Sequence, residues 1–71
     1  LFEPAVADFS RAIELDPEMG PAYGNRGVVY AELGDTEKAI ADLEMALTLL
    51  DNVRHAEQRV QIRELLGRLE R

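Results

Sequence analysis

The chain has 71 residues, with 14 acidic side chains, eight lysines or arginines and one histidine, and its net charge is −6. A domain of this size has one small core that supplies only about 3–5 kcal/mol of stability. The absence of cysteine excludes disulfides and thiolate chemistry, and a single histidine argues against a metal or cofactor site.

The first predicted helix covers residues 2–15, where apolar residues recur every three or four positions, as in a helix that buries one stripe. The stripe contains Ala5, Phe9, Ala12 and Ile13. The helix is expected to end at Asp16, because the residue before a proline is driven out of the helical region. Met19 and Gly20 then turn the chain, and Pro21 suits the first turn of the next helix.

The second predicted helix covers residues 21–33, and Tyr23, Gly27 and Tyr30 share one of its faces. We expect the two tyrosines to belong to the core or to the edge of a groove. A glycine inside a helix costs about 1 kcal/mol relative to alanine, so its position between the tyrosines predicts that another helix passes very close. We expect this close contact to involve Gly27 and Ala46.

The third predicted helix covers residues 36–50, after Gly34 in a left-handed conformation and Asp35 as the N-cap. It repeats the first helix after 34 residues, a period typical of two-helix units that bury their apolar faces by stacking on further copies. The identical residues are Glu3, Ala5, Ala7, Asp8, Ala12 and Leu15 in the first copy and Glu37, Ala39, Ala41, Asp42, Ala46 and Leu49 in the second. Asp8 and Asp42 are both expected to be solvated.

The fourth predicted helix covers residues 53–69, with an apolar stripe and a charged outer face that closes the stack towards water. The stripe contains Ile62, Leu65, Leu66 and Leu69, and the charged face contains Arg59, Arg63, Glu64 and Arg68. Asp51 and Asn52 could turn the chain before this helix. Because no proline stands there, the third and fourth helices could also run on as one.

The charge is divided unevenly along the chain. Residues 1–53 carry a net charge of −8, and residues 54–71 carry +2. An acidic body disfavours nucleic acid as a partner, since neutralisation of phosphates supplies most non-specific affinity. The basic end could bind phosphate, but we favour arginines that are solvated or lie on the acidic body.

No apolar run approaches the roughly 20 residues of a membrane span, and no signal-peptide pattern is visible, so we expect no membrane partner. Together with the absence of cysteine, this favours a cytoplasmic location. The chain begins with Leu1 rather than methionine, so we expect a fragment or a processed product.

One pattern of residue types and spacings is found in two copies within residues 1–51. The strings Ala22-Tyr23-Gly24-Asn25-Arg26-Gly27-Val28-Val29-Tyr30, Leu33-Gly34-Asp35, Lys38-Ala39-Ile40 and Ala46-Leu47 resemble one full tetratricopeptide repeat. On this resemblance, residues 1–19 correspond to the second helix and closing turn of a preceding repeat, 20–52 to the full repeat, and 53–71 to a solvating C-terminal helix. The departures from the family pattern are Asp51 for proline, Leu43 for an aromatic residue and Arg26 for leucine.

The resemblance implies an all-α fold of about four antiparallel helices, part of a superhelix that binds a peptide or protein on its concave face. The residues that match this face are Pro21, Gly24, Asn25, Val28, Ala31 and Glu32. Asn25 also matches an asparagine that helps some members to clamp a terminal carboxylate. Glu32 and the acidic body oppose a carboxylate ligand, so we expect the bound segment to be neutral or basic.

Two alternative functions remain open. The chain could self-associate through its first helix, where Val6, Phe9 and Ile13 need two neighbouring helices and this chain offers one. It could also be an accessory segment of a larger enzyme. The segment itself is not expected to be an enzyme, because no nucleophile or metal ligand accompanies His55, which we expect on the surface.

Overall fold

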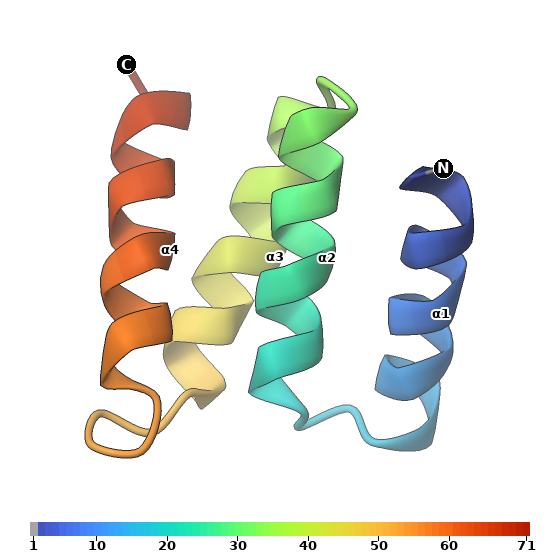
Figure 1. Ribbon diagram of the computed structural model, residues 1–71, viewed down its shortest axis with the longest axis horizontal. Coiled ribbons are helices and arrows are strands. Elements are labelled where there is room, and N and C mark those ends of the chain that lie inside the picture. Colours follow the sequence, from blue (N-terminus) through green and yellow to red (C-terminus); the bar gives the residue numbers. More distant parts are fainter. Residues whose placement is uncertain (1) are drawn as a thin grey trace.

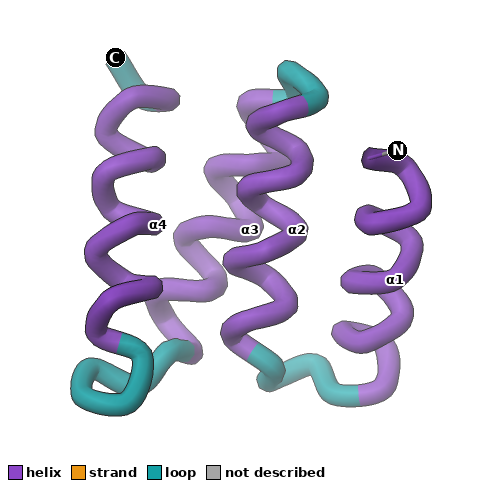
Figure 2. Tube along the Cα trace, in the orientation of Figure 1, coloured by secondary structure: helices purple, strands orange, loops and turns teal. Residues whose placement is uncertain are grey.

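The computed structural model describes residues 2–71, and the side chains from residue 3 onward, as four α-helices without strands (Figures 1 and 2). They are α1 (Phe2–Leu15), α2 (Gly20–Glu32), α3 (Thr36–Leu49) and α4 (Ala56–Leu69). Each helix runs antiparallel to the next one along the chain, so α2 and α4 point the same way. The predicted all-α class and antiparallel arrangement are therefore confirmed. None of the helices in residues 2–71 is long and apolar enough to cross a membrane.

The turns around α2 have the local chemistry that the sequence predicts. Pro21 lies in the first turn of α2, where its missing N–H leaves no hydrogen bond unmade. Gly34 has φ of 83°, a left-handed conformation that is costly for residues with a Cβ. The carboxylate of Asp35 accepts a hydrogen bond from the backbone N–H of Lys38 at 3.3 Å and so caps α3.

The core lies where α3 and α4 meet and is lined by α2. Its buried residues are Leu43, Ala46, Leu50, Ile62 and Leu66. Leu43 is fully buried and packs against Gly27 of α2. Tyr23 and Ile40 pack against this cluster from its margin. Most of the apolar burial in this small chain therefore depends on α3 being covered on two sides.

Gly27 marks the close approach of α2 and α3. A Cβ on this glycine would lie 2.8 Å from Cγ of Leu43 and 3.2 Å from the carbonyl oxygen of Ala39. Ala46 of α3 lies opposite Gly24 of α2, where its Cβ is 3.6 Å from the position of an added Cβ. The prediction that Gly27 and Ala46 are contact points between these two helices is therefore confirmed.

The connection between α3 and α4 is a separate loop, so the two helices are not continuous. Leu50 is extended, with φ of −74° and ψ of 137°, and ends α3. Asp51 then accepts hydrogen bonds from the backbone N–H groups of Val53 at 2.7 Å and Arg54 at 2.8 Å. These bonds fold residues 51–54 into a turn, and α4 begins at Ala56 rather than at the predicted Val53.

Arg59 ties α4 back to the end of α3. Its Nη1 donates hydrogen bonds to the carbonyl oxygens of Leu47 at 2.6 Å and Leu50 at 3.1 Å. The carbonyl of Leu47 belongs to the last turn of α3, where no backbone donor remains to pair with it, and Leu50 is the residue that ends the helix. The prediction that Arg59 lies on the charged outer face is therefore wrong, because its side chain is half-buried.

The helix α1 lies at the edge of the molecule opposite α4 (Figure 1). In the described part of the chain it packs against α2 and against neither α3 nor α4. Val6, Phe9 and Ile13 are consequently half-buried rather than buried. The expectation that the first helix finds one neighbour within this chain is confirmed.

Candidate functional site

The open face of α2 is defined here by Asn25, Val28 and Glu32, which are all exposed. Their spacing of three and four residues places them on one side of the helix, and half-buried Pro21 begins the same row. Val28 keeps 41% of its surface exposed. This side of α2 therefore presents an apolar side chain that lies between the amide of Asn25 and the carboxylate of Glu32. The prediction that these three residues face away from the core is confirmed.

Gly24, which was also expected on the binding face, is instead buried between α2 and α4. A Cβ at this position would lie 2.8 Å from Nε2 of Gln58 and 3.1 Å from Cδ1 of Ile62. The backbone of Gly24 is therefore a packing surface for α4. Ala31, another residue expected on this face, is half-buried. The open face therefore contains fewer exposed residues than the six that were expected on it.

The helix α4 forms one flank of the open face. It runs parallel to α2 and is in contact with it near Gly24 (Figure 1). Its outer side carries an open hollow of about 570 Å³ lined mainly by arginines. The lining residues are Arg63, Glu64, Gly67, Arg68 and Arg71. A ligand that lies on α2 therefore meets acidic charge at Glu32, while the outer side of α4 carries basic charge.

Behind the open face, α2 is fixed by a charged group that the sequence analysis missed. Arg26 donates two hydrogen bonds to the carboxylate of Asp42, from Nε at 2.7 Å and from Nη2 at 2.9 Å. Its Nη1 also donates to the hydroxyl of Ser10 at 3.0 Å, so a single guanidinium links α1, α2 and α3. The hydrogen bond to Asp42 raises the pKa of Arg26 above its ordinary value.

Two aromatic rings complete the surroundings of this guanidinium. The rings of Tyr23 and Tyr30 have their centroids 5.8 and 5.7 Å from Cζ of Arg26, within the range of cation–π attraction. The Tyr23 hydroxyl donates to the carbonyl oxygen of Pro17 at 3.1 Å. Both tyrosines are half-buried, and they hold the arginine in place beside the core.

The expectation that Asp42 is solvated is wrong, since only 7% of the residue is exposed. Its position in the chain carried a signal: Asp42 falls within the stripe formed by Ala39, Leu43 and Ala46 at three- and four-residue spacing. A carboxylate in a buried stripe needs a cation or several hydrogen bonds. Arg26 on the facing helix α2 was the candidate for the cation that pairs with this carboxylate. Asp8, the other copy of this residue, is exposed as expected.

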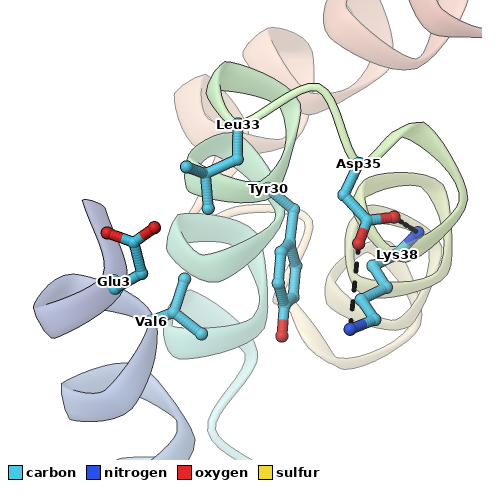
Figure 3. Close-up of a pocket in the computed structure, with 6 residues that line it drawn as sticks. All are labelled: Glu3, Val6, Tyr30, Leu33, Asp35 and Lys38. Atoms are coloured by element: carbon cyan, nitrogen blue, oxygen red, sulfur yellow. Dashed lines mark hydrogen bonds and ion pairs between the residues drawn. The ribbon is translucent and has the colours of Figure 1, made fainter.

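An open pocket of about 440 Å³ lies where the start of α1 faces the end of α2 and the start of α3 (Figure 3). Its lining residues are Glu3, Val6, Tyr30, Leu33, Asp35 and Lys38. Tyr30 lies between α1 and Lys38, whose ammonium is 5.5 Å from the ring centroid and 3.8 Å from the Asp35 carboxylate. Of the residues expected to mediate self-association, Val6 lines this pocket.

His55 is half-buried rather than on the surface as expected, because it lies where the loop meets the start of α4. Its Nδ1 is buried and has no hydrogen-bond partner among the described residues. No group of three or more potential metal ligands occurs within residues 2–71. We therefore place the candidate site on the open face of α2, not at the histidine.

Comparison with known proteins identifies the family. The sequence model for a tetratricopeptide repeat family matches residues 1–67. The chain belongs to the tetratricopeptide repeat family. Such repeats are in general protein–protein interaction modules. No solved structure is significantly similar to the chain.

Three curated relatives show how widely the repeat is used. Tetratricopeptide repeat protein 36 of Danio rerio is 41% identical over 92% of this chain and 35% of its own length. Tetratricopeptide repeat protein 16 of Macaca fascicularis is 37% identical over 93% of the chain and 8% of its own length. Hsp70-Hsp90 organizing protein 1 of Glycine max is 44% identical over 65% of the chain and 8% of its own length. The chain thus spans a minor part of each relative.

Proposed function

We propose that the open face of α2 binds an extended segment of a partner protein, with α4 as one wall of the binding surface. The main support for this proposal is that α2 has one side packed against neighbouring helices and another side exposed to solvent. Gly24 and Gly27 are buried against the neighbouring helices, whereas Asn25, Val28 and Glu32 remain exposed. A tetratricopeptide repeat leaves these side chains free of the packing that holds the helices together.

The chemistry of this face favours a neutral or basic segment with at least one apolar side chain. The amide of Asn25 can both donate to and accept from a peptide backbone. Val28 offers an apolar contact, and Glu32 attracts a lysine or arginine. The net charge of −6 adds a long-range preference for basic partners at low ionic strength.

The test is binding of the purified chain to arrayed short peptides of neutral, basic and acidic composition. We expect basic and neutral peptides to bind, and Glu32→Lys to abolish binding of the basic ones. Glu44→Lys is the matched control, because Glu44 is an exposed glutamate on α3 and the substitution changes the net charge equally. Binding confined to acidic peptides with a free terminal carboxylate, and abolished by Asn25→Ala, would contradict the proposal and favour a carboxylate clamp.

A further inference from the structure

Gly67 of α4 differs from the glycines inside α2. At Gly24 and Gly27 an added Cβ would meet a side chain of a neighbouring helix at 2.8 Å, whereas at Gly67 it would meet nothing within 4 Å. Gly67 is not a left-handed residue either, because Gly34 is the one glycine with a positive φ among the described residues. Neither a turn nor packing within residues 2–71 therefore requires this glycine, although it costs α4 helical stability.

The surface around Gly67 is open and basic. Gly67 lines the hollow on the outer side of α4 together with Arg63, Arg68, Arg71 and Glu64. All five residues are exposed, and none of the three arginines forms an ion pair within the part of the chain that the structure describes. Their charges are therefore available to a ligand, and the missing Cβ at Gly67 allows that ligand to approach the backbone of α4.

Val60 adds an apolar contact to the same side of α4. It stands seven residues before Gly67, about two helical turns, so the two residues share one side of the helix. Val60 keeps 53% of its surface exposed, which is unusual for an apolar residue with no contact to make. We call this surface the basic face of α4, and it consists of Val60, Arg63, Glu64, Gly67, Arg68 and Arg71.

We propose that the basic face of α4 docks an acidic segment of a partner protein, whose backbone passes over Gly67. Aspartate or glutamate side chains of the segment pair with the arginines, because a guanidinium and a carboxylate can form two parallel hydrogen bonds. An apolar side chain of the segment lies on Val60. The open face of α2 carries Glu32 and favours basic segments, so the two surfaces select partners of opposite charge.

The charges of the basic face argue against a second copy of this chain on the same face. If two copies of α4 crossed antiparallel at Gly67, Arg63 of each would lie opposite Arg71 of the other, since both stand four residues from the glycine. A parallel crossing would place each arginine beside its own copy. Both arrangements bring like charges together without a carboxylate between them.

Nucleic acid and a further packed helix fit this face less well than an acidic segment. Nucleic acid carries a negative charge on every phosphate, and both Glu64 and the net charge of −8 on residues 1–53 repel it. The seams between helices in this chain are lined by small and apolar side chains, whereas Gly67 is surrounded by charged ones. A protein segment can space its carboxylates to avoid Glu64.

The experiment measures binding of the purified chain to arrayed acidic peptides with blocked ends. Each peptide carries glutamates at helical spacing and one leucine at a varied position, and its counterpart has glutamine in place of glutamate. We expect the acidic peptides to bind more tightly than their counterparts, and the binding to weaken as salt screens the charges. Arg68→Gln should weaken the binding about five-fold, and Arg63→Gln in addition should weaken it about ten-fold or more.

Two further variants separate docking from folding and from net charge. Gly67→Ala should raise the melting temperature of the chain yet weaken peptide binding by at least about five-fold, because the new methyl group occupies the contact. Arg54→Gln is the matched control for the arginines. It removes the same charge from an exposed residue of the loop before α4, about 16 Å of helix away from Gly67, which is beyond the range of a screened charge.

Four results would overturn the proposal. They are equal binding of acidic and glutamine peptides, unchanged or tighter binding by Gly67→Ala, an equal loss in Arg54→Gln, and a loss in Asn25→Ala, which would place the peptides on α2. A single-stranded oligonucleotide that binds more tightly than the acidic peptides would identify a phosphate site instead. A dimer of the parent in light scattering that Arg63→Gln with Arg68→Gln dissociates would assign the face to the acidic body of a second copy.

Discussion

The guanidinium of Arg26 and the carboxylate of Asp42 form a two-fold hydrogen-bonded ion pair across the contact between α2 and α3. The side chains are 19% and 9% exposed, so water screens the pair only slightly. In such surroundings each charge depends on the other, because an unpaired buried charge is far more costly than an exposed one. The pair thereby couples the position of α2 to that of α3.

Breaking this ion pair should destabilise the protein strongly. We expect Asp42→Ala to lower the free energy of unfolding by about 3–5 kcal/mol, because it leaves the Arg26 guanidinium without its partner. Urea unfolding followed by circular dichroism measures the effect. The control is the double variant Arg26→Leu with Asp42→Leu, which removes both charges and keeps apolar volume. If the double variant were less stable than Asp42→Ala, the destabilisation would not arise from an unpaired charge.

Substitution of glycine by alanine should have opposite effects on stability at Gly27 of α2 and at Gly67 of α4. Gly27→Ala should destabilise the protein, because the new methyl group would lie 2.8 Å from the fully buried Leu43 and overpacking costs about 1–3 kcal/mol. Gly67→Ala should stabilise it by up to about 1 kcal/mol, since alanine favours helix. A Cβ at Gly67 meets nothing within 4 Å. Equal melting temperatures of the two variants would refute the close approach at Gly27.

Arg59 should contribute to stability through the end of α3 rather than through its charge. Arg59→Ala removes the hydrogen bonds to the carbonyl oxygens of Leu47 and Leu50, and we expect a loss of about 1.5–3 kcal/mol. Arg63→Ala is the matched control, because Arg63 is an exposed arginine four residues further along α4. Thermal unfolding should separate the two variants clearly. A loss of the same size in both would mean that net charge, not the capping of α3, is responsible.

The turn after α3 should make stability depend on acidic pH. Hydrogen bonds from the backbone N–H groups of Arg54 and Val53 lower the pKa of Asp51 below its ordinary 3.8. A lowered pKa means that the stabilisation is complete above pH 3.8 and is lost as pH falls through the pKa of the folded state. We expect Asp51→Asn to lower the melting temperature at neutral pH and the difference from the parent to shrink at acidic pH. A difference that stayed constant with pH would contradict this assignment.

Most of the helix boundaries could be predicted because they depend on local signals in the sequence. Gly34 and Asp35 act on their immediate neighbours, so their conformations followed from the sequence. Gly27 was informative because a glycine in a helix is unfavourable unless another element passes close to it. Local signals of this kind fixed three of the four helices to within about two residues.

The start of α4 and the candidate site depended on contacts that no local pattern contains. Asp51 sets the loop by accepting hydrogen bonds from Val53 and Arg54. The expectation that the family pattern stops before residue 53 is wrong, because the family model extends to residue 67. The burial of Gly24 follows from where α4 lies after that loop. Asp42 has the same residue type as Asp8, and the difference in their burial comes from the presence or absence of a covering helix. Such differences belong to tertiary structure.

The two buried glycines, Gly24 and Gly27, also affect how this protein can change during evolution. They keep the seams of α2 narrow, so packing against the neighbours constrains these two positions tightly. Asn25, Val28 and Glu32 contribute little to those seams and can be replaced at a small cost in stability. The exposed row can therefore change in sequence while the helices keep their arrangement.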